Sequence, residues 1–179
     1  MQGKAKFRPV LLASTLSWCY FVHPTTVIPI IVVAGYVWLF QRRYFWYFAI
    51  GGAVWVPLLL VYSWHNFNQL LPNYFQAGRL GFHSFWEALP GNLVSPSRGL
   101  LVYVPVLVAI VLVLVRYRKV IPEKRLVVSS LIVVTAHLLM ISGFDHWWAG
   151  HSYGPRYWTS LVPWFVLLAM IGVCGLRSS

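Results

Sequence analysis

The sequence is poor in charged residues, and above all in acidic ones. Of its 179 residues only 9% are charged, and three Asp and Glu stand against 14 Lys and Arg. Soluble domains carry about 25% charged and about 45–50% apolar residues, whereas this chain is 59% hydrophobic with a mean hydropathy of +0.70. The composition excludes a water-soluble globule and predicts an integral membrane protein.

Cysteine and the common soluble-enzyme motifs are also scarce or absent. Cys19 and Cys174 lie inside apolar segments without a partner at a motif spacing, which argues against a disulfide framework or a cysteine zinc site. No Walker loop, dinucleotide fingerprint or nucleophile elbow is present. His146 and His151 are five residues apart and do not share a helix face. We therefore expect no cofactor and no metal.

Four apolar segments have the length of membrane-spanning helices, namely residues 44–64, 99–115, 126–143 and 157–176. A fifth segment, 9–40, would form a helix about 48 Å long, which exceeds the ~30 Å of a bilayer core. Because His23 and Pro24 lie near its middle, we predict a helical hairpin that turns there. No cleavage site of the small-x-small type follows the basic N-terminal residues, so we expect the N-terminus to stay attached.

This arrangement places most basic residues on one side of the membrane. Eleven of the 14 Lys and Arg fall on the side of the N-terminus, and only Arg79, Arg98 and Arg156 fall opposite. Since loops rich in Lys and Arg face the cytoplasm, we predict that both termini are cytoplasmic and that residues 65–98 and 144–156 are external. The net charge of +11 then marks topology and contact with anionic lipid, not nucleic-acid binding.

A short amphipathic helix is predicted in the first external segment. Phe82, Phe85, Trp86 and Leu89 recur at helical spacing, which places them on one face. We expect this helix to lie on the outer membrane surface; the alternative is that the stripe packs on the protein. The predicted fold is all-α, a polytopic membrane bundle of about six helices that includes the N-terminal hairpin and this interfacial helix, in a single membrane domain over 1–179.

The few external polar residues are the functional candidates, because charge in or beside a bilayer is costly. Segment 95–98 (SPSR) has a capping serine, a proline at the first helical position and an arginine in the first turn before an apolar segment. Segment 154–156 (GPR) repeats the pattern before the last span. Two helix N-termini, each with a guanidinium, predict a phosphate-binding site built from Ser97, Arg98 and Arg156.

Segment 145–153 is aromatic and contains glycine, as a loop over a sugar or a lipid headgroup would be. We expect a sugar or acceptor pocket lined by Asp145, His146, Trp147, Trp148, His151 and Tyr153. The alternative is an ordinary aromatic belt at the membrane interface. For the two arginines the alternatives are extension toward the interface or pairing with Glu87 and Asp145.

Segments 92–100 (NLVSPSRGL) and 147–157 (WWAGHSYGPRY) together resemble bacterial GT-C glycosyltransferases. The resemblance is closer to the C-terminal half of the multi-pass proteins of the protein-mannosyltransferase-like and lipopolysaccharide-core-transferase-like group, and it extends over the whole chain. It implies transfer of a sugar from a polyprenyl-phosphate donor to a lipid, glycan or protein acceptor. The reaction would take place on the non-cytoplasmic face of the bacterial inner membrane.

The resemblance leaves the catalytic residue unknown. Members of this group typically carry an acidic catalytic residue in a first external loop, well upstream of these motifs, and the sequence shows no such loop. Sugar transfer needs a carboxylate to take the acceptor proton, and outside the predicted cytoplasmic face only Glu87 and Asp145 are acidic. Neither matches the family position. We expect the C-terminal part of a longer transferase, inactive alone.

Two other functions stay open. Segments interrupted by Pro24 and Pro57 are typical of a transporter or channel subunit, although the predicted spans hold almost no ionisable residue. A non-catalytic membrane scaffold would use Gly35, Gly51 and Gly52 for close helix contacts.

Overall fold

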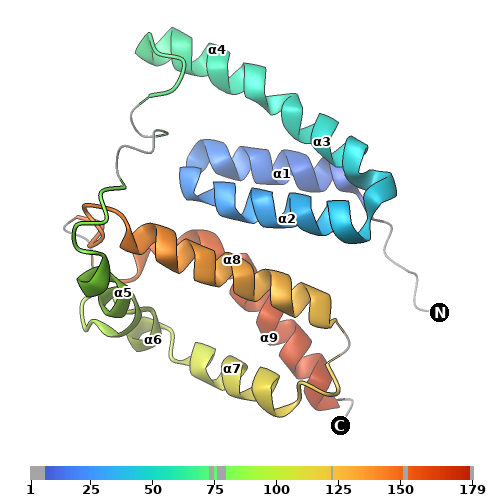
Figure 1. Cartoon of the computed structure of the whole chain (residues 1–179), viewed down its shortest axis with the longest axis vertical. Coiled ribbons are helices and arrows are strands. Elements are labelled where there is room, and N and C mark those ends of the chain that lie inside the picture. The colour runs from blue at the N-terminus through green and yellow to red at the C-terminus, as the bar shows by residue number, and fades with distance from the viewer. Residues whose placement is uncertain (1–6, 73–74, 76–79, 122, 151–152, 178–179) are drawn as a thin grey trace. The chain divides into compact units, whose positions relative to one another are not determined.

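The computed structural model describes residues 7–72, 75, 80–121, 123–150 and 153–177. All regular elements within these ranges are helices, apart from one isolated antiparallel bridge between Leu80 and Phe144. The all-α prediction is confirmed for this part of the chain. Residues 1–76 and 77–179 form two compact units (Figure 1), and each is described by itself. The assignment of 1–179 to a single membrane domain stays a prediction.

The first unit begins with the predicted helical hairpin. Helix α1 (Pro9–Val22) ends at His23, whose φ of −142° and ψ of 102° are those of extended backbone. A residue that precedes proline avoids the helical region, so the chain leaves the helix here. It turns through η1 (Pro24–Thr26) into α2 (Val27–Phe40). The turn at His23 is confirmed, and each 14-residue helix is about 21 Å long, shorter than a bilayer core.

The predicted span 44–64 is an almost continuous helix. It is formed by η2 (Arg42–Tyr44), α3 (Phe45–Ala53) and α4 (Trp55–Phe67). The whole segment Arg42–Phe67 has 26 residues and is long and apolar enough to cross a membrane.

Helix α3 packs closely on α1 in the first unit. Ala13, Val37 and Phe48 form a buried cluster that joins α1, α2 and α3. A Cβ atom at Gly51 would lie 3.0 Å from the Cα atom of Val10, so this glycine permits a close contact between α3 and α1 within the chain. Gly35, by contrast, faces open space.

In the second unit, two of the three segments predicted as spans are helical within a few residues of their predicted bounds. Helix α8 (Lys124–Ser142) covers the predicted 126–143. The segment Arg156–Leu176 covers 157–176 and combines η5 (Arg156–Leu161) with α9 (Val162–Arg177). Both are long and apolar enough to cross a membrane.

The prediction of one continuous helix over 99–115 is wrong. The segment is divided into α6 (Leu100–Tyr103) and α7 (Val106–Arg116). Pro105 has no N–H to donate and its ring pushes Val104 out of the helical region, as the φ of −131° and ψ of 62° at Val104 show. The 11 residues of α7 span about 16 Å.

The predicted amphipathic helix is α5 (Phe85–Val94). It begins after Phe82 because Phe82 has a left-handed φ of 56°. Its buried residues are Ala88 and Asn92, whereas the Trp86 side chain is 82% exposed. Trp86 therefore does not pack on the protein, and it is available to a membrane interface.

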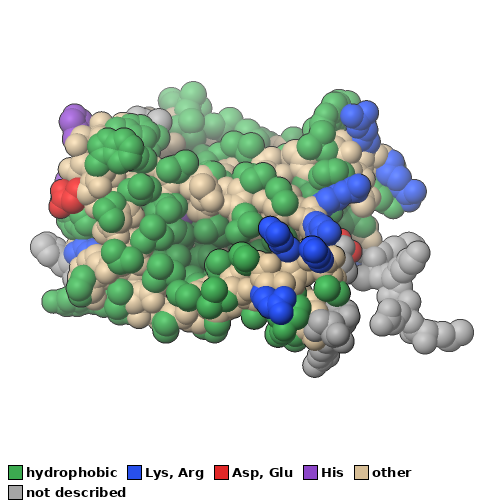
Figure 2. All heavy atoms as spheres, turned by 60° about the horizontal axis from the view of Figure 1, so that its bottom comes forward, with side chains coloured by type: hydrophobic (Ala, Val, Ile, Leu, Met, Phe, Trp, Pro, Cys, Tyr) green, Lys and Arg blue, Asp and Glu red, His purple; other side chains and the backbone are tan. Residues whose placement is uncertain are grey.

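Hydrophobic side chains, coloured green, cover much of the face that Figure 2 shows. Trp18, Val61, Leu112 and Met170 are all more than half exposed. Only 17% to 28% of the residues in the three spanning windows are buried. Such extensive apolar exposure is not found in soluble monomers, and it fits helices that face lipid.

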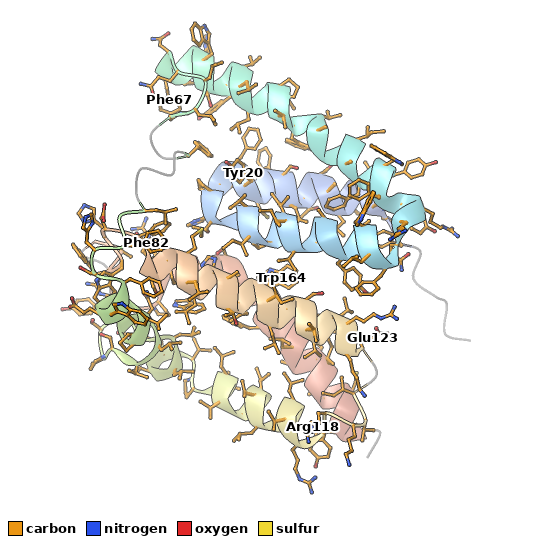
Figure 3. All side chains as sticks on the ribbon, in the orientation of Figure 1. Tyr20, Phe67, Phe82, Arg118, Glu123 and Trp164 are labelled. Atoms are coloured by element: carbon orange, nitrogen blue, oxygen red, sulfur yellow. The ribbon has the colours of Figure 1, made fainter. Side chains whose placement is uncertain are left out.

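In the second unit the two ends of α8 differ in chemistry. Figure 3 places Phe82 near the Ser142 end and Glu123 and Arg118 at the Lys124 end. The candidate site lies at the Ser142 end, and the connection from α7 to α8, which is rich in Lys and Arg, lies at the other.

Candidate functional site

Two loops of the second unit meet beside the end of α8. The backbone N–H groups of Gly81 and Phe82 both donate to the carbonyl oxygen of Gly143, each at 3.1 Å. A Cβ atom at Gly81 would lie 1.8 Å from Oδ1 of Asp145, and one at Gly143 would lie 2.6 Å from Cε1 of Phe82. The two glycines therefore allow the loops to approach and fix the position of Asp145.

Asp145 pairs with a histidine, not with an arginine. The Nδ1 atom of His83 lies 3.1 Å from Oδ1 of Asp145, and the side chains are 84% and 43% exposed. An exposed contact of this kind contributes little to stability. No contact of Asp145 with Arg98 or Arg156 occurs among the described residues, so the expected alternative of an arginine pair at Asp145 is not observed there.

The tryptophan pair of the loop is anchored on one side only. A Cβ atom at Gly91 of α5 would lie 2.6 Å from Cη2 of Trp147, so this glycine receives the Trp147 ring. Trp147 contacts Trp148 edge-on at 6.2 Å between ring centroids, and Trp148 contacts His146 at 5.1 Å. Trp148 is 40% exposed. In this pair the Trp147 ring is packed against α5, whereas the Trp148 ring is accessible to solvent or to a ligand.

The two sequence motifs touch each other through the backbone. The N–H of Gly154 donates to the carbonyl oxygen of Ser97 at 2.8 Å. Gly154 has a φ of 90°, a conformation that favours glycine. The hydroxyl groups of Ser95 and Ser97 lie 3.1 Å apart. The structure therefore brings segments 95–98 and 154–156 together, as the placement of both on one side of the membrane requires.

The prediction of a helix N-terminus at segment 95–98 is wrong. Ser95 ends α5, with φ and ψ of −62° and 136°, and forms no side-chain cap. The N–H groups of Arg98 and Gly99 both donate to the Ser95 carbonyl oxygen, at 3.2 and 2.6 Å. These donors are used within a turn, because Pro96 continues the non-helical backbone after Ser95 and helix α6 starts only at Leu100.

Arg98 nevertheless carries the most unusual polar atom of the site. Its side chain is partly buried, and its Nη1 atom is buried without a hydrogen-bond partner in the described part of the chain. A buried guanidinium N–H that has no acceptor is costly. The atom therefore requires an acceptor that the described residues do not supply.

Arg156 stands at a helix start as predicted, although the first turn is a 3-10 helix. Its side chain is exposed. Its N–H donates to the Gly154 carbonyl oxygen at 2.9 Å, and its own carbonyl accepts from the Thr159 hydroxyl at 2.8 Å. Both arginines are thus connected to Gly154, Arg156 directly and Arg98 through its neighbour Ser97.

The other predicted pocket residues lie close by or outside the described ranges. Tyr153 is 86% exposed. His146 is exposed, and its carbonyl oxygen accepts from the Tyr157 hydroxyl at 3.2 Å. His151 lies outside the described residues. Within the described ranges no three His, Cys, Asp or Glu side chains gather as metal ligands would.

Sequence reasoning missed a buried polar layer next to this site. His137 of α8 is fully buried, and its Nε2–H donates to the Tyr157 carbonyl oxygen at 2.8 Å, because a carbonyl can only accept. The amide of Asn92 donates to the Ser142 hydroxyl at 3.2 Å. An ionisable residue inside an apolar run is itself a signal, and it singles out His137.

Comparisons with known proteins identify no relative. No protein-family model, no curated protein and no solved structure matches this chain significantly.

Proposed function

We propose that this chain is the C-terminal membrane portion of a glycosyltransferase of the GT-C type, which takes its sugar from a polyprenyl-phosphate donor. The observation that carries the proposal is the unpartnered Nη1 of Arg98 beside the Ser97–Gly154 hydrogen bond. A phosphate oxygen is an acceptor suited to a guanidinium N–H. The backbone of Arg156, which carries the second guanidinium, is hydrogen-bonded to Gly154 at the same place.

In the proposed reaction the acceptor hydroxyl attacks the anomeric carbon while a carboxylate removes its proton. The bond from that carbon to the phosphate oxygen breaks, and polyprenyl phosphate leaves with the negative charge. Arg98 and Arg156 would stabilise this charge as it develops. Asp145, His146, Trp147, Trp148, His151 and Tyr153 would contact the sugar or the acceptor. The carboxylate is not assigned to a residue of this chain.

The membrane location of the proposal is supported by the three helices that are long and apolar enough to cross a bilayer. The proposed location is the bacterial inner membrane, with both termini in the cytoplasm and the paired motifs on the far side.

Binding of the donor lipid tests the phosphate assignment without requiring activity. The chain is placed in phosphatidylcholine nanodiscs and titrated with polyprenyl phosphate. Arg98→Ala and Arg156→Ala are each expected to weaken binding about tenfold or more, because a hydrogen bond to a charged group contributes about 1.5–3 kcal/mol. Arg116→Ala, which removes an exposed arginine at the end of α7, should leave the affinity within about twofold. Unchanged affinity in both site variants would remove the assignment.

A transporter or channel subunit is the less well supported alternative. Its best observation is His137, an ionisable side chain inside a predicted span. His137 lies near the Ser142 end of α8 and donates to a backbone carbonyl, which is what a packing residue does. Uptake of a solute by liposomes that contain the chain would favour transport over sugar transfer.

A further inference from the structure

An apolar groove lies between α7 and α8, at the end opposite the candidate site. It has a volume of about 350 Å³. Its walls are aliphatic and come from both helices and the connection between them, and they include Val111, Leu114, Val115, Val127, Val128 and Leu131. Pockets of this size accept small molecules or parts of larger ones.

The hollow continues along α8 toward the candidate site. A second apolar hollow of about 390 Å³ shares Val128 and Leu131 with the first and extends to Leu139. From Lys124 to Leu139 the two together follow α8 for about 22 Å at 1.5 Å per residue. The second hollow is lined by residues of α8 alone, so it forms an open strip along that helix, which suits an extended hydrocarbon chain more than a compact ligand.

The groove is cationic at its mouth. Arg118 and Lys124 belong to its lining, and both are exposed. The connection 116–125 holds five basic residues against a single acidic one, Glu123. The mouth therefore attracts an anion, whereas the interior accepts only apolar groups.

The position of these two cations matches that of lipid headgroups. Helix α8 has 19 residues and is about 28 Å long, close to the thickness of a bilayer core. When α8 spans the membrane, Lys124 at its first position therefore lies at headgroup level, and the apolar groove lies among the acyl chains. Basic pockets between spanning helices on the cytoplasmic side are suited to anionic lipid headgroups.

We propose that this groove binds one anionic phospholipid of the cytoplasmic leaflet. Its phosphate lies between Arg118 and Lys124, and one acyl chain runs along α8 past Val128 and Leu131. The proposal depends on α8 spanning the membrane and not on the proposed glycosyltransferase function, because it uses neither Arg98 nor Arg156.

The experiment uses the full chain in phosphatidylcholine nanodiscs that contain a small fraction of phosphatidylglycerol with a photoreactive diazirine in its acyl chain. After illumination, labelled peptides are mapped by mass spectrometry. We expect labelling concentrated between residues 111 and 139, and competition by unlabelled phosphatidylglycerol but not by added phosphatidylcholine. Arg118→Gln with Lys124→Gln should lower this labelling about tenfold or more, because the variant loses two charge-assisted contacts with the lipid phosphate.

Further variants distinguish a specific lipid site from general attraction of the anionic lipid to the basic connection. Arg116→Gln with Lys119→Gln removes the same charge from the same connection but from outside the groove lining, and labelling should stay within about twofold. Val128→Trp fills the groove and keeps both cations, so it should lower labelling, whereas Leu112→Trp on the exposed side of α7 should not.

The proposal would be overturned by equal competition by phosphatidylcholine, by equal loss in both charge-removing pairs, or by labelling dispersed over all spans. A groove covered by a second polypeptide would give no lipid label between residues 111 and 139, together with a cross-linked larger species, and this too would refute it. Loss of polyprenyl-phosphate binding in the Arg98 variant would leave the result unaffected, so the two proposals fail separately.

Discussion

At the scale of single residues, glycine determines much of the geometry of the candidate site. Gly81, Gly91 and Gly143 each lie where a Cβ atom would overlap a side chain, namely those of Asp145, Trp147 and Phe82. The sequence contains these glycines without showing what they face, because their partners are 56 to 64 positions away in the chain. The Ser97–Gly154 contact was equally hidden, since a backbone hydrogen bond leaves no pattern in side chains.

Gly91→Ala is expected to displace Trp147 and destabilise the second unit. The added methyl group would sit 2.6 Å from two carbons of the indole ring, and overpacking of this kind costs about 1–3 kcal/mol. Thermal unfolding in detergent, followed by tryptophan fluorescence, should show a lower midpoint and altered emission.

Gly35→Ala is the matched control for this prediction. Gly35 is also helical, but its Cβ position is open, so alanine should leave the midpoint unchanged or raise it through helix propensity. Equal midpoints for the two variants would contradict the packing of Trp147 on Gly91.

At the scale of elements, hydrophobic length predicts the helical segments well, and proline accounts for the exceptions. His23-Pro24 was recognised because segment 9–40 is too long for a bilayer, so its turn was anticipated. Pro105 lies in a segment of suitable length and was overlooked, although the same restriction on the preceding residue breaks the helix there. The hydropathy of a segment is an average over its residues. It therefore does not reveal that one of them, Pro105, lacks the N–H that a continuous helix needs.

Pro105→Ala is expected to join α6 and α7 into one helix. Alanine restores an N–H and releases Val104 from its non-helical conformation. Hydrogen exchange in detergent should slow across residues 104–108. Pro163→Ala in the first turn of α9 should change local exchange little, because proline is tolerated at that position. Unaltered exchange at 104–108 would mean that tertiary packing, and not proline, separates the two helices.

At the scale of the whole molecule, the exposed apolar surface is the property that composition predicted best. Hydropathy alone predicts three of the helical segments that are long and apolar enough to cross a membrane. The side of the membrane on which the paired motifs lie follows from the distribution of lysine and arginine and stays a prediction. It has the largest consequences, because a donor site and an anionic-lipid groove are proposed on opposite faces.

Cysteine labelling in intact cells tests this topology. Cys19 and Cys174 are both exposed and are first replaced by serine. Ser97→Cys and Tyr153→Cys should then react with a membrane-impermeant maleimide from outside, whereas Lys119→Cys should react only after the cells are opened. Reaction of Lys119→Cys in intact cells, or protection of either outer position, would invert or refute the orientation.

The hydrogen bond from Gly154 to Ser97 makes the two arginine-bearing turns mechanically one part, although they are 57 positions apart in the chain. A ligand that displaces the Arg98 turn must also displace the start of the last helical segment or break this hydrogen bond. If the proposed phosphate site is occupied, we expect a movement of the Arg98 turn to be transmitted to the start of the last helical segment, and a spectroscopic probe near Leu176 would detect it.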